Sequence, residues 1–508
     1  MECVMCVFDH LHKEFSINSL GHRLRSVPMF LALIPFVIGV VLAEYLVVPL
    51  YVVLGSILLM AVVAIVAVPR NIALCYVAVA LLFVGYITAV LRTPSCAVPY
   101  NQDVEMVVAV ESIPSVRGDY SIADGRIEQW CGDDEWREAN CRVVLWLRAD
   151  SIVFGDRLTV CARLKERFSR HDDYNDLMRH RGYVGGVAVD GYNVVSKEHL
   201  EPTNIQSLAI QKLGKYTKDR ASHATVVAMA VGARHDIPAE LRATYSKTGL
   251  AHLLAVSGLH LGVVLMVVGL LLIPLRFVHR GHRLAALISI VAVWLYAIMS
   301  GSSPSVLRAA IMLTVLLLAH VSSARYNSVN VLSATAFVML VVSPDYVYDV
   351  SFQLSVAAVF GIVVWGVPLR QAIRSLPWVV SCLLSLFIVG GVATLWTMPI
   401  ISHTFGNIPL VGVLLTPCVL LFSYVVVVGG IVAVVLPVAL ASPFVLVAEW
   451  AASVQNCVVE WAANLPMASV DYTMSELGVA VCYVVYAVIT LFYWSKNQKK
   501  VITLPRYD

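Results

Sequence analysis

Two histidines and a serine lie inside an otherwise apolar stretch of the chain, residues 249–262. His252, Ser257 and His260 are followed directly by the aliphatic run Val263–Ile273. Polar side chains inside a membrane span are costly, and they usually serve a function. We therefore predict that these three side chains line a polar path or a narrow gate.

The spacing of the two histidines restricts their chemistry. His252 and His260 are eight residues apart, or about 12 Å along an unbroken helix. They cannot ligate one ion or share one proton unless the helix breaks near Ser257-Gly258. The alternative is a packing role, in which each imidazole donates to a backbone carbonyl. Gly258 and Gly262 form a GxxxG face that would allow a neighbouring helix to approach closely.

Enzymatic motifs are incomplete in this sequence. Ser257 lies in Ala-Val-Ser-Gly, one residue short of a GxSG pattern, with His260 or His403 as the candidate base of an intramembrane protease. No HExxH, zinc-type cysteine spacing or GxxxxGK[ST] motif occurs. We expect neither a metal nor a cofactor, and we expect that the chain is not an enzyme.

A second motif combines a helix start with a cation one turn further along the chain. Ser303 is a good N-cap and Pro304 a good first helical residue, so a helix is predicted to begin there. Its N-terminus and Arg308 together could hold an anion. Alternatively, Arg308 extends its side chain to the outer lipid head groups.

Further polar groups fall within or between apolar segments. Asn330, Gln353 and Ser355 are predicted either to join helices or to line a pore. His403 belongs to Thr397–Pro409, which is rich in helix breakers and is predicted to lie between spans as a re-entrant segment.

Composition identifies a polytopic membrane protein. Of 508 residues, 59% are hydrophobic and 14% charged, against about 25% charged in soluble domains. The alternation of basic and acidic loops predicts about twelve spans with both termini cytoplasmic. The predicted spans are Pro28–Val48, Leu50–Val68, Ile72–Leu91, His252–Leu275, Leu284–Met299, Pro304–Ala319, Val329–Val342, Phe352–Val367, Trp378–Ala393, Pro409–Val435, Pro443–Ala463 and Leu477–Trp494. Pro443–Ala463 carries enough polar residues to be an interfacial helix instead.

A polar insertion, residues 100–200, interrupts these spans. Its alternating stretches, separated by glycines, predict a small OB-like β-barrel outside the cytoplasm. Residues 101–200 contain 13 Lys/Arg and 18 Asp/Glu, a net charge of −5. Single-strand binders usually present a positive groove, so a structural barrel and a nucleic-acid guide both stay open. We also expect one disulfide among its cysteines, with Cys131 and Cys141 as the candidate pair.

The predicted organisation has six parts. A cytoplasmic tail (1–27) precedes three helices (28–99), the β domain (100–200), a connecting helical region (201–248), the main transmembrane domain (249–494) and a basic cytoplasmic tail (495–508). In the connecting region Lys212, Lys215 and Lys218 share one helix face. That face would meet either lipid head groups or nucleic-acid phosphate.

Three motifs together resemble the ComEC competence-protein family. They are Ala251–His260, Pro304–Met312 and Phe352–Ser355, and the resemblance extends over residues 28–437. It implies a channel through which single-stranded DNA crosses the bacterial cytoplasmic membrane during transformation. On this basis His252, Ser257, His260, Arg308, Asn330, Gln353, Ser355 and His403 would line the DNA path.

The chain departs from the family pattern in several places. The metallo-β-lactamase-like nuclease domain found in many members is not seen before Asp508, and Leu414-Leu-Thr-Pro417 stands where the family pattern leads us to expect an Asn before the proline. The resemblance implies separate partners: a DNA receptor, a cytoplasmic ATPase or helicase, and single-strand-binding proteins, with self-association left open. Two alternatives remain, a secondary transporter of a small solute and a membrane scaffold of an uptake assembly.

Overall fold

The computed structural model describes most of the chain outside the two termini. The described residues are 27–46, 48–49, 55–56, 73–92, 96–112, 114–117, 119–132, 135–148, 152, 154–168, 175–176, 178–179, 181–190, 193–199, 205–214, 219–234, 236–322, 327–466 and 468–496. The predicted tails 1–27 and 495–508 and the predicted span Leu50–Val68 fall largely outside them.

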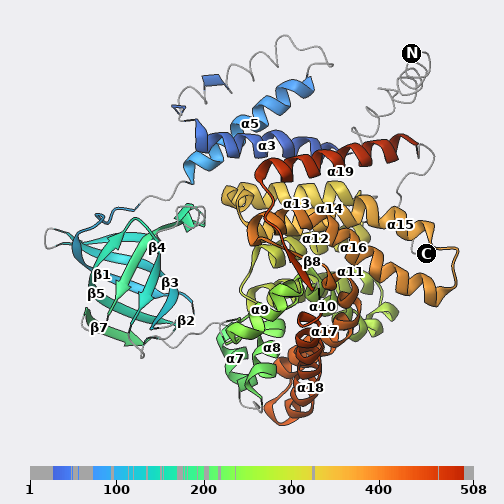
Figure 1. The fold of residues 1–508 in the computed structure, drawn as a ribbon. Coiled ribbons are helices and arrows are strands. Elements are labelled where there is room, and N and C mark those ends of the chain that lie inside the picture. Colours follow the sequence, from blue (N-terminus) through green and yellow to red (C-terminus); the bar gives the residue numbers. More distant parts are fainter. Residues whose placement is uncertain are drawn as a thin grey trace.

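A helical domain and a separate β domain make up the molecule (Figure 1). The helices are α3 (Pro28–Tyr45), α5 (Ala73–Leu91), α7 (Ile205–Gly214), α8 (Arg220–Val231), α9 (Ala239–Lys247), α10 (Gly258–Leu271), α11 (Gly281–Met299), α12 (Pro304–Val321), α13 (Ser328–Val342), α14 (Val350–Gly361), α15 (Val367–Ala372), α16 (Trp378–Phe405), α17 (Val411–Val435), α18 (Val438–Ala463) and α19 (Glu476–Lys496). Short 3-10 turns cover Ala251–Leu253, Ile273–Phe277 and Pro344–Val347, and Ile362–Gly366 form a π-helical turn.

Seven of the described helices are long and apolar enough to cross a membrane. They are Pro28–Tyr45, Gly281–Met299, Pro304–Val321, Val350–Ala372, Trp378–Phe405, Val411–Val435 and Glu476–Tyr493, and three shorter apolar helices accompany them. Together with the composition, these helices establish a multi-pass helical membrane protein.

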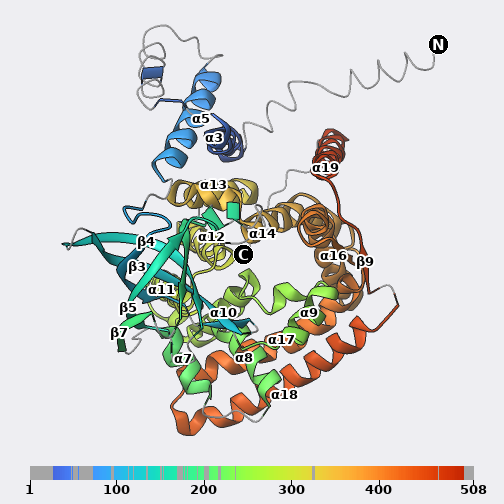
Figure 2. The same ribbon diagram turned by 60° about the vertical axis from the view of Figure 1, so that its left-hand side comes forward.

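Seven strands form the β domain, which lies to one side of the helices (Figure 2). They are β1 (Asp103–Val110), β2 (Ser115–Arg117), β3 (Tyr120–Gly132), β4 (Glu135–Leu147), β5 (Asp156–Lys165), β6 (Tyr183–Val189) and β7 (Val194–His199). The ladder runs β1-β3-β4-β6-β5, and β5 pairs again with β1, so five strands close into a ring. Its β4–β6 pair is parallel. Burial alternates along β5, as expected for a strand with one face in a core.

The disulfide of the β domain joins Cys96 to Cys141, with a Cα–Cα distance of 5.8 Å. One disulfide was predicted among these cysteines, but the candidate pair Cys131–Cys141 is wrong, because Cys131 is a free thiol. Strand register explains the difference. Cys141 lies opposite Ile127 in the β3–β4 ladder, four residues from Cys131, a separation of roughly 13 Å along the strand.

Helix α16 extends twelve residues beyond the predicted span Trp378–Ala393. The predicted re-entrant segment is wrong for Thr397–Phe405, which continues the helix through Pro399. The helix stops at Gly406, whose φ of 68° is left-handed. A short strand, β8 (Asn407–Pro409), then pairs with β9 (Ser469–Asp471).

The connecting region packs against the helical domain. Lys212 of α7 donates to the carbonyl of Val434, at 2.6 Å, and to that of Leu436. A lysine at the C-terminus of α17 satisfies carbonyls that the helix leaves free and complements its dipole. The prediction that Lys212 faces head groups or phosphate is therefore wrong, while Lys215 and Lys218 lie outside the described residues.

Helix α18 buries the polar residues that suggested an interfacial position. Gln455 is fully buried, and Glu449 and Asn456 are each 6% exposed. These groups find partners inside the protein, and α18 is not among the described helices that are long and apolar enough to cross a membrane, so the choice between a span and an interfacial helix for Pro443–Ala463 stays a prediction. Asn456 Oδ1 accepts from the Tyr245 hydroxyl at 2.8 Å, and Gln455 Nε2 donates to the same hydroxyl at 2.9 Å.

Candidate functional site

The chain leaves the helical conformation at Ser257-Gly258, the position at which a joint role of the two histidines would need a break. Ser257 has an extended backbone and caps α10, which begins at Gly258. The single span predicted from His252 to Leu275 is therefore wrong at its start. Residues 254–257 are irregular, so His252 and His260 no longer share one helix face.

His260 stabilises the first turn of α10. Its Nδ1 accepts a hydrogen bond from the Ser257 backbone N–H at 3.1 Å and lies 3.0 Å from the Ser257 hydroxyl. A backbone N–H can only donate, so Nδ1 carries no proton and the neutral ring is protonated at Nε2. This Nε2 is buried and has no hydrogen-bond partner in the described structure. The proposed packing role, donation to a carbonyl, is wrong for His260.

His252 has the opposite tautomer. Its Nδ1 lies 3.0 Å from the carbonyl oxygen of Gly249, so Nδ1 donates and Nε2 keeps its lone pair. The side chain is exposed, whereas Leu253 and Leu254 are buried beside it. His252 therefore presents an acceptor nitrogen to open space. The two imidazoles offer one acceptor and one donor rather than a matched pair of ligands.

The loop before His252 is held between α9 and α17. Gly249 has a φ of 75°, and a Cβ there would lie 2.6 Å from Pro409. A Cβ on Gly412 would lie 2.5 Å from the carbonyl oxygen of Thr248. These contacts bring the end of the Thr397–Pro409 motif against the histidine motif, which the sequence pattern did not predict.

The two glycines of the predicted GxxxG face behave differently. A Cβ on Gly258 would lie 3.3 Å from the Cβ of Ala309, so the first turn of α10 packs closely on α12. A Cβ on Gly262 would meet nothing within 4 Å. The predicted close helix approach is therefore found at Gly258 and is wrong at Gly262.

Arg308 lies inside the helical domain, one turn into α12. It is 4% exposed, and its Nε and Nη1 have no hydrogen-bond partner in the described structure. The alternative in which Arg308 extends to lipid head groups does not fit this burial. Ser305, three residues earlier, lies 3.3 Å from the hydroxyl of Ser355 on α14. The second and third sequence motifs therefore meet at the start of α12.

The other three predicted path residues bond to backbone groups. Asn330 accepts from the N–H of Met29 at 3.3 Å, which joins α13 to α3. Gln353 donates to the carbonyl of Val347 at 2.7 Å. His403 Nδ1 lies 2.9 Å from the carbonyl of Met474. These bonds give each side chain a structural role at its own position.

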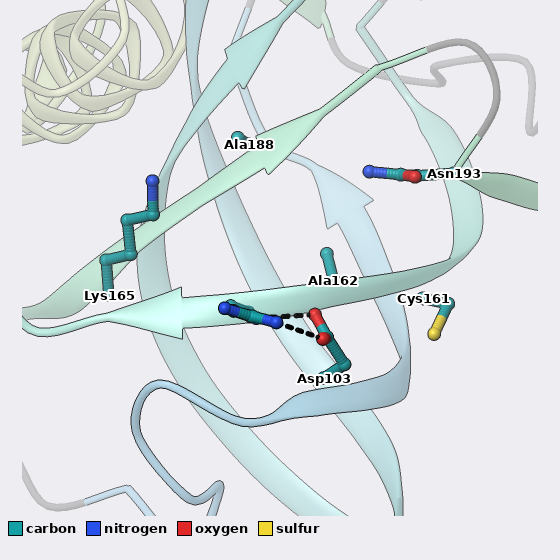
Figure 3. A pocket seen from close by; sticks show the side chains of 7 residues that line it. Asp103, Cys161, Ala162, Lys165, Ala188 and Asn193 are labelled. Atoms are coloured by element: carbon teal, nitrogen blue, oxygen red, sulfur yellow. Dashed lines mark hydrogen bonds and ion pairs between the residues drawn. The ribbon is translucent and has the colours of Figure 1, made fainter.

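Basic side chains of the β domain are neutralised by neighbouring carboxylates. An open pocket of about 190 Å³ lies on this domain, and Figure 3 shows the side chains that line it. Arg163 forms two hydrogen bonds with Asp103 there, at 2.8 and 2.6 Å. This guanidinium holds the pKa of Asp103 below its ordinary value, mainly by hydrogen bonding. Arg157 likewise pairs with Glu128. The outer surface of β5 is therefore less positive than its sequence suggests.

One ion pair connects the β domain to the helical domain. Arg181, just before β6, lies 3.6 Å from Asp349. Asp349 also caps α14 by accepting from the Phe352 N–H at 2.9 Å. The β domain thus contacts the end of the helical domain at which α14 begins, and Ser355 follows on the same helix.

Sequence reasoning missed a buried polar network on α8, α9, α17 and α18. It contains Thr225, Tyr245, Ser423, Gln455 and Asn456, and a separate His223–Glu449 pair lies nearby at 3.1 Å on α8 and α18. The polar residues of α18 were the available signal. Their partners are more than 200 residues earlier in the chain, with the exception of Ser423.

Comparisons with known proteins match the same region. The family model "Competence protein" matches residues 229–497, from α8 to α19. ComE operon protein 3 of Bacillus subtilis is 31% identical over 219 residues, 43% of this chain and 27% of that protein. Recombination protein 2 of Haemophilus influenzae is 25% identical over 187 residues, 35% of this chain and 23% of that protein.

An uncharacterized protein of Aquifex aeolicus is 35% identical over 161 residues, 31% of this chain and 37% of that protein. The matched segments thus span between about a quarter and two fifths of the length of these relatives. No solved structure matches the chain. Because the family model covers 269 of its 508 residues, and as its motifs predicted, the chain belongs to the competence protein family.

Proposed function

We propose that the protein is a channel that translocates single-stranded DNA across the bacterial cytoplasmic membrane during natural transformation. Family membership and relatives named for competence and recombination support a role in DNA uptake. One structural observation supports the channel most directly. Residues 248–257 form a loop inside the helical domain that contains the 3-10 turn Ala251–Leu253, and His252 on this loop is exposed. Irregular backbone at membrane depth is tolerated where it is buried in protein or lines a water-filled cavity.

On this proposal the loop forms a narrow point of the path. His252 Nε2 offers an acceptor, and the bond from Nδ1 to Gly249 fixes its direction. His260 and Ser257 hold the start of α10 in place by their mutual hydrogen bonds. His252 would contact the strand, while His260 and Ser257 would position the loop.

We propose an OB-like role for the β domain as the outer guide. The closed order β1-β3-β4-β6-β5 with one parallel pair supports the OB-like assignment. The Cys96–Cys141 disulfide favours an oxidising, extracytoplasmic compartment. Because Arg157 and Arg163 are already paired, this domain would guide the strand without holding it tightly. A receptor, an ATPase or helicase and single-strand-binding proteins would be separate partners.

The test is uptake of labelled DNA into the cytoplasm of a deletion strain. Wild type is expected to restore uptake, and His252→Ala is expected to fail although it reaches the membrane in normal amounts. His282→Ala, which changes an exposed histidine at the start of α11, is the matched control and should restore uptake. Normal uptake in the deletion strain would exclude the channel and favour a solute transporter. Full rescue of DNA uptake by His252→Ala would contradict the proposal that this loop lines the DNA path.

A further inference from the structure

An unpaired guanidinium lies inside the helical domain at the start of α12. Arg308 is only 4% exposed, and two of its three side-chain nitrogens lack partners. Burying a charge without a counter-charge costs several kcal/mol. No carboxylate forms an ion pair with Arg308 in the described part of the chain. The described part of the chain therefore supplies no counter-charge for this cation, and an anionic ligand would provide one.

The same position carries free backbone donors. Pro304 has no N–H, and the Leu307 N–H bonds to Ser303, so helix geometry leaves Ser305 and Val306 without intrahelical acceptors. The Ser303 side chain makes no capping bond. Side chains on a helix lean toward its N-terminus, and this tendency favours an Arg308 that reaches toward these donors. The helix dipole adds a positive end at the same place.

Two hydroxyl groups complete the arrangement. Ser305 and Ser355 lie 3.3 Å apart, and they come from α12 and α14. Asp349, which caps α14, contacts Arg181 of the β domain. The start of α12 and the start of α14 are therefore on the side of the helical domain that the β domain contacts. A strand leaving that domain would meet Ser355 and Arg308 early.

We infer that the first turn of α12, with Arg308, Ser305 and Ser355, is a subsite that binds one phosphodiester of the transported strand at a time. This inference rests on the proposed function. A phosphodiester carries one negative charge, which balances the single guanidinium. Its two non-bridging oxygens match the fork of arginine donors. The burial of Arg308 excludes a site on the lipid-facing surface.

Binding of a labelled oligothymidylate to the full chain in phosphatidylcholine nanodiscs tests the subsite. Affinity is measured from roughly 50 to 200 mM salt, because each single-strand phosphate contact contributes about 0.7 to the slope of log affinity against log salt. Arg308→Gln is expected to lower that slope by about 0.7. Ser355→Ala should weaken binding with the slope unchanged, because a hydroxyl carries no charge.

Two controls keep the result interpretable. Arg370→Gln removes an exposed arginine of α15 and should leave the slope unchanged. Arg308→Lys keeps the charge, so it should keep the slope while losing the fork geometry and some affinity. If Arg308→Gln fails to fold, the Ser355→Ala affinity and the Arg308→Lys slope still decide the matter.

The outcomes separate the subsite from the channel. Oligonucleotide binding with an unchanged slope in Arg308→Gln would overturn the subsite and leave the channel standing. A second outcome is a wild-type protein that does not bind oligothymidylate but is stabilised by inorganic phosphate in a way that depends on Arg308. The site would then bind an anion, and the DNA strand would be excluded as its ligand. Stabilisation by phosphatidylglycerol alone, lost in Arg308→Gln, would assign the site to a lipid head group and overturn the inference.

Discussion

The Tyr486 hydroxyl lies 3.1 Å from the carbonyl oxygen of Leu395, the acceptor that Pro399 leaves without its usual backbone donor. Tyr483, one turn earlier on α19, donates to the carbonyl of Trp396 at 2.8 Å. A proline within a membrane helix is tolerated where a neighbouring helix satisfies the freed carbonyls. Helix α19 therefore allows α16 to continue to Phe405.

This relationship predicts a coupling between two substitutions. Tyr486→Phe should destabilise the protein by about 0.6 to 1.7 kcal/mol, the range of hydrogen bonds between membrane helices. In a Pro399→Ala background the cost should shrink, because that substitution restores a backbone N–H that can donate to Leu395. Unfolding in detergent measures both values. Tyr493→Phe, on the exposed face of α19, is the control, and equal costs in the two backgrounds would contradict the coupling.

The disulfide gives a prediction on gels and in unfolding. Reductant should slow the migration of wild type and Cys131→Ser alike, and it should have no effect on Cys96→Ser or Cys141→Ser. Closing a loop of 45 residues stabilises by about 4 kcal/mol in the chain-entropy model. The β domain should therefore unfold at lower denaturant in the last two variants. A reductant response that survives Cys96→Ser would exclude the assigned pair.

The Asp103–Arg163 pair predicts a gain of binding. The depressed pKa of Asp103 means that the pair is complete above the ordinary carboxyl range and is lost only as pH falls through the lower folded value. At neutral pH Asp103→Asn should free Arg163, strengthen oligothymidylate binding and raise its salt slope by about 0.7. Asp471→Asn, in β9, serves as the comparison. Unchanged binding in Asp103→Asn would mean that the strand does not contact this surface.

The buried network predicts that the loss of a single hydroxyl group lowers the stability of the protein substantially. Tyr245→Phe removes the acceptor of Gln455 and the donor to Asn456, and unsatisfied buried groups cost about 1 to 3 kcal/mol each. A clear loss of thermal stability is expected, against little change for Tyr424→Phe on a more exposed face of α17. Equal stability of the two variants would show that water replaces the lost hydroxyl.

Local signals in the sequence predicted the family, the multi-pass helical class and the β domain, whereas about twelve spans were expected and seven of the described helices are long and apolar enough to cross a membrane. The break at Ser257-Gly258 was named only as the condition under which the two histidines could act together, and a continuous span was predicted there. Helix starts at Pro304 and Ser328 agree with their capping residues. These features depend on residues within one or two turns of each other.

What the sequence could not predict depends on distant partners. Pro399 predicted a break, and the helix continues because Tyr486, 91 residues beyond Leu395, supplies a donor. Glu449, Gln455 and Asn456 suggested an interface, and they are buried because Tyr245 and His223 face them. Cys141 has three candidate partners in the sequence; strand register separates it from Cys131, and the fold brings Cys96 beside it.

The pairing of Cys96 with Cys141 also bears on how the chain matures. On the proposed extracytoplasmic placement of the β domain, Cys131, which precedes Cys141 by ten residues, would reach the oxidising compartment first. A Cys96–Cys131 bridge can then form before the native partner arrives, and thiol–disulfide exchange must move it. On this reasoning we expect the yield of the correctly bridged protein to rise with the supply of a disulfide isomerase, and a yield that is the same with and without isomerase would contradict it.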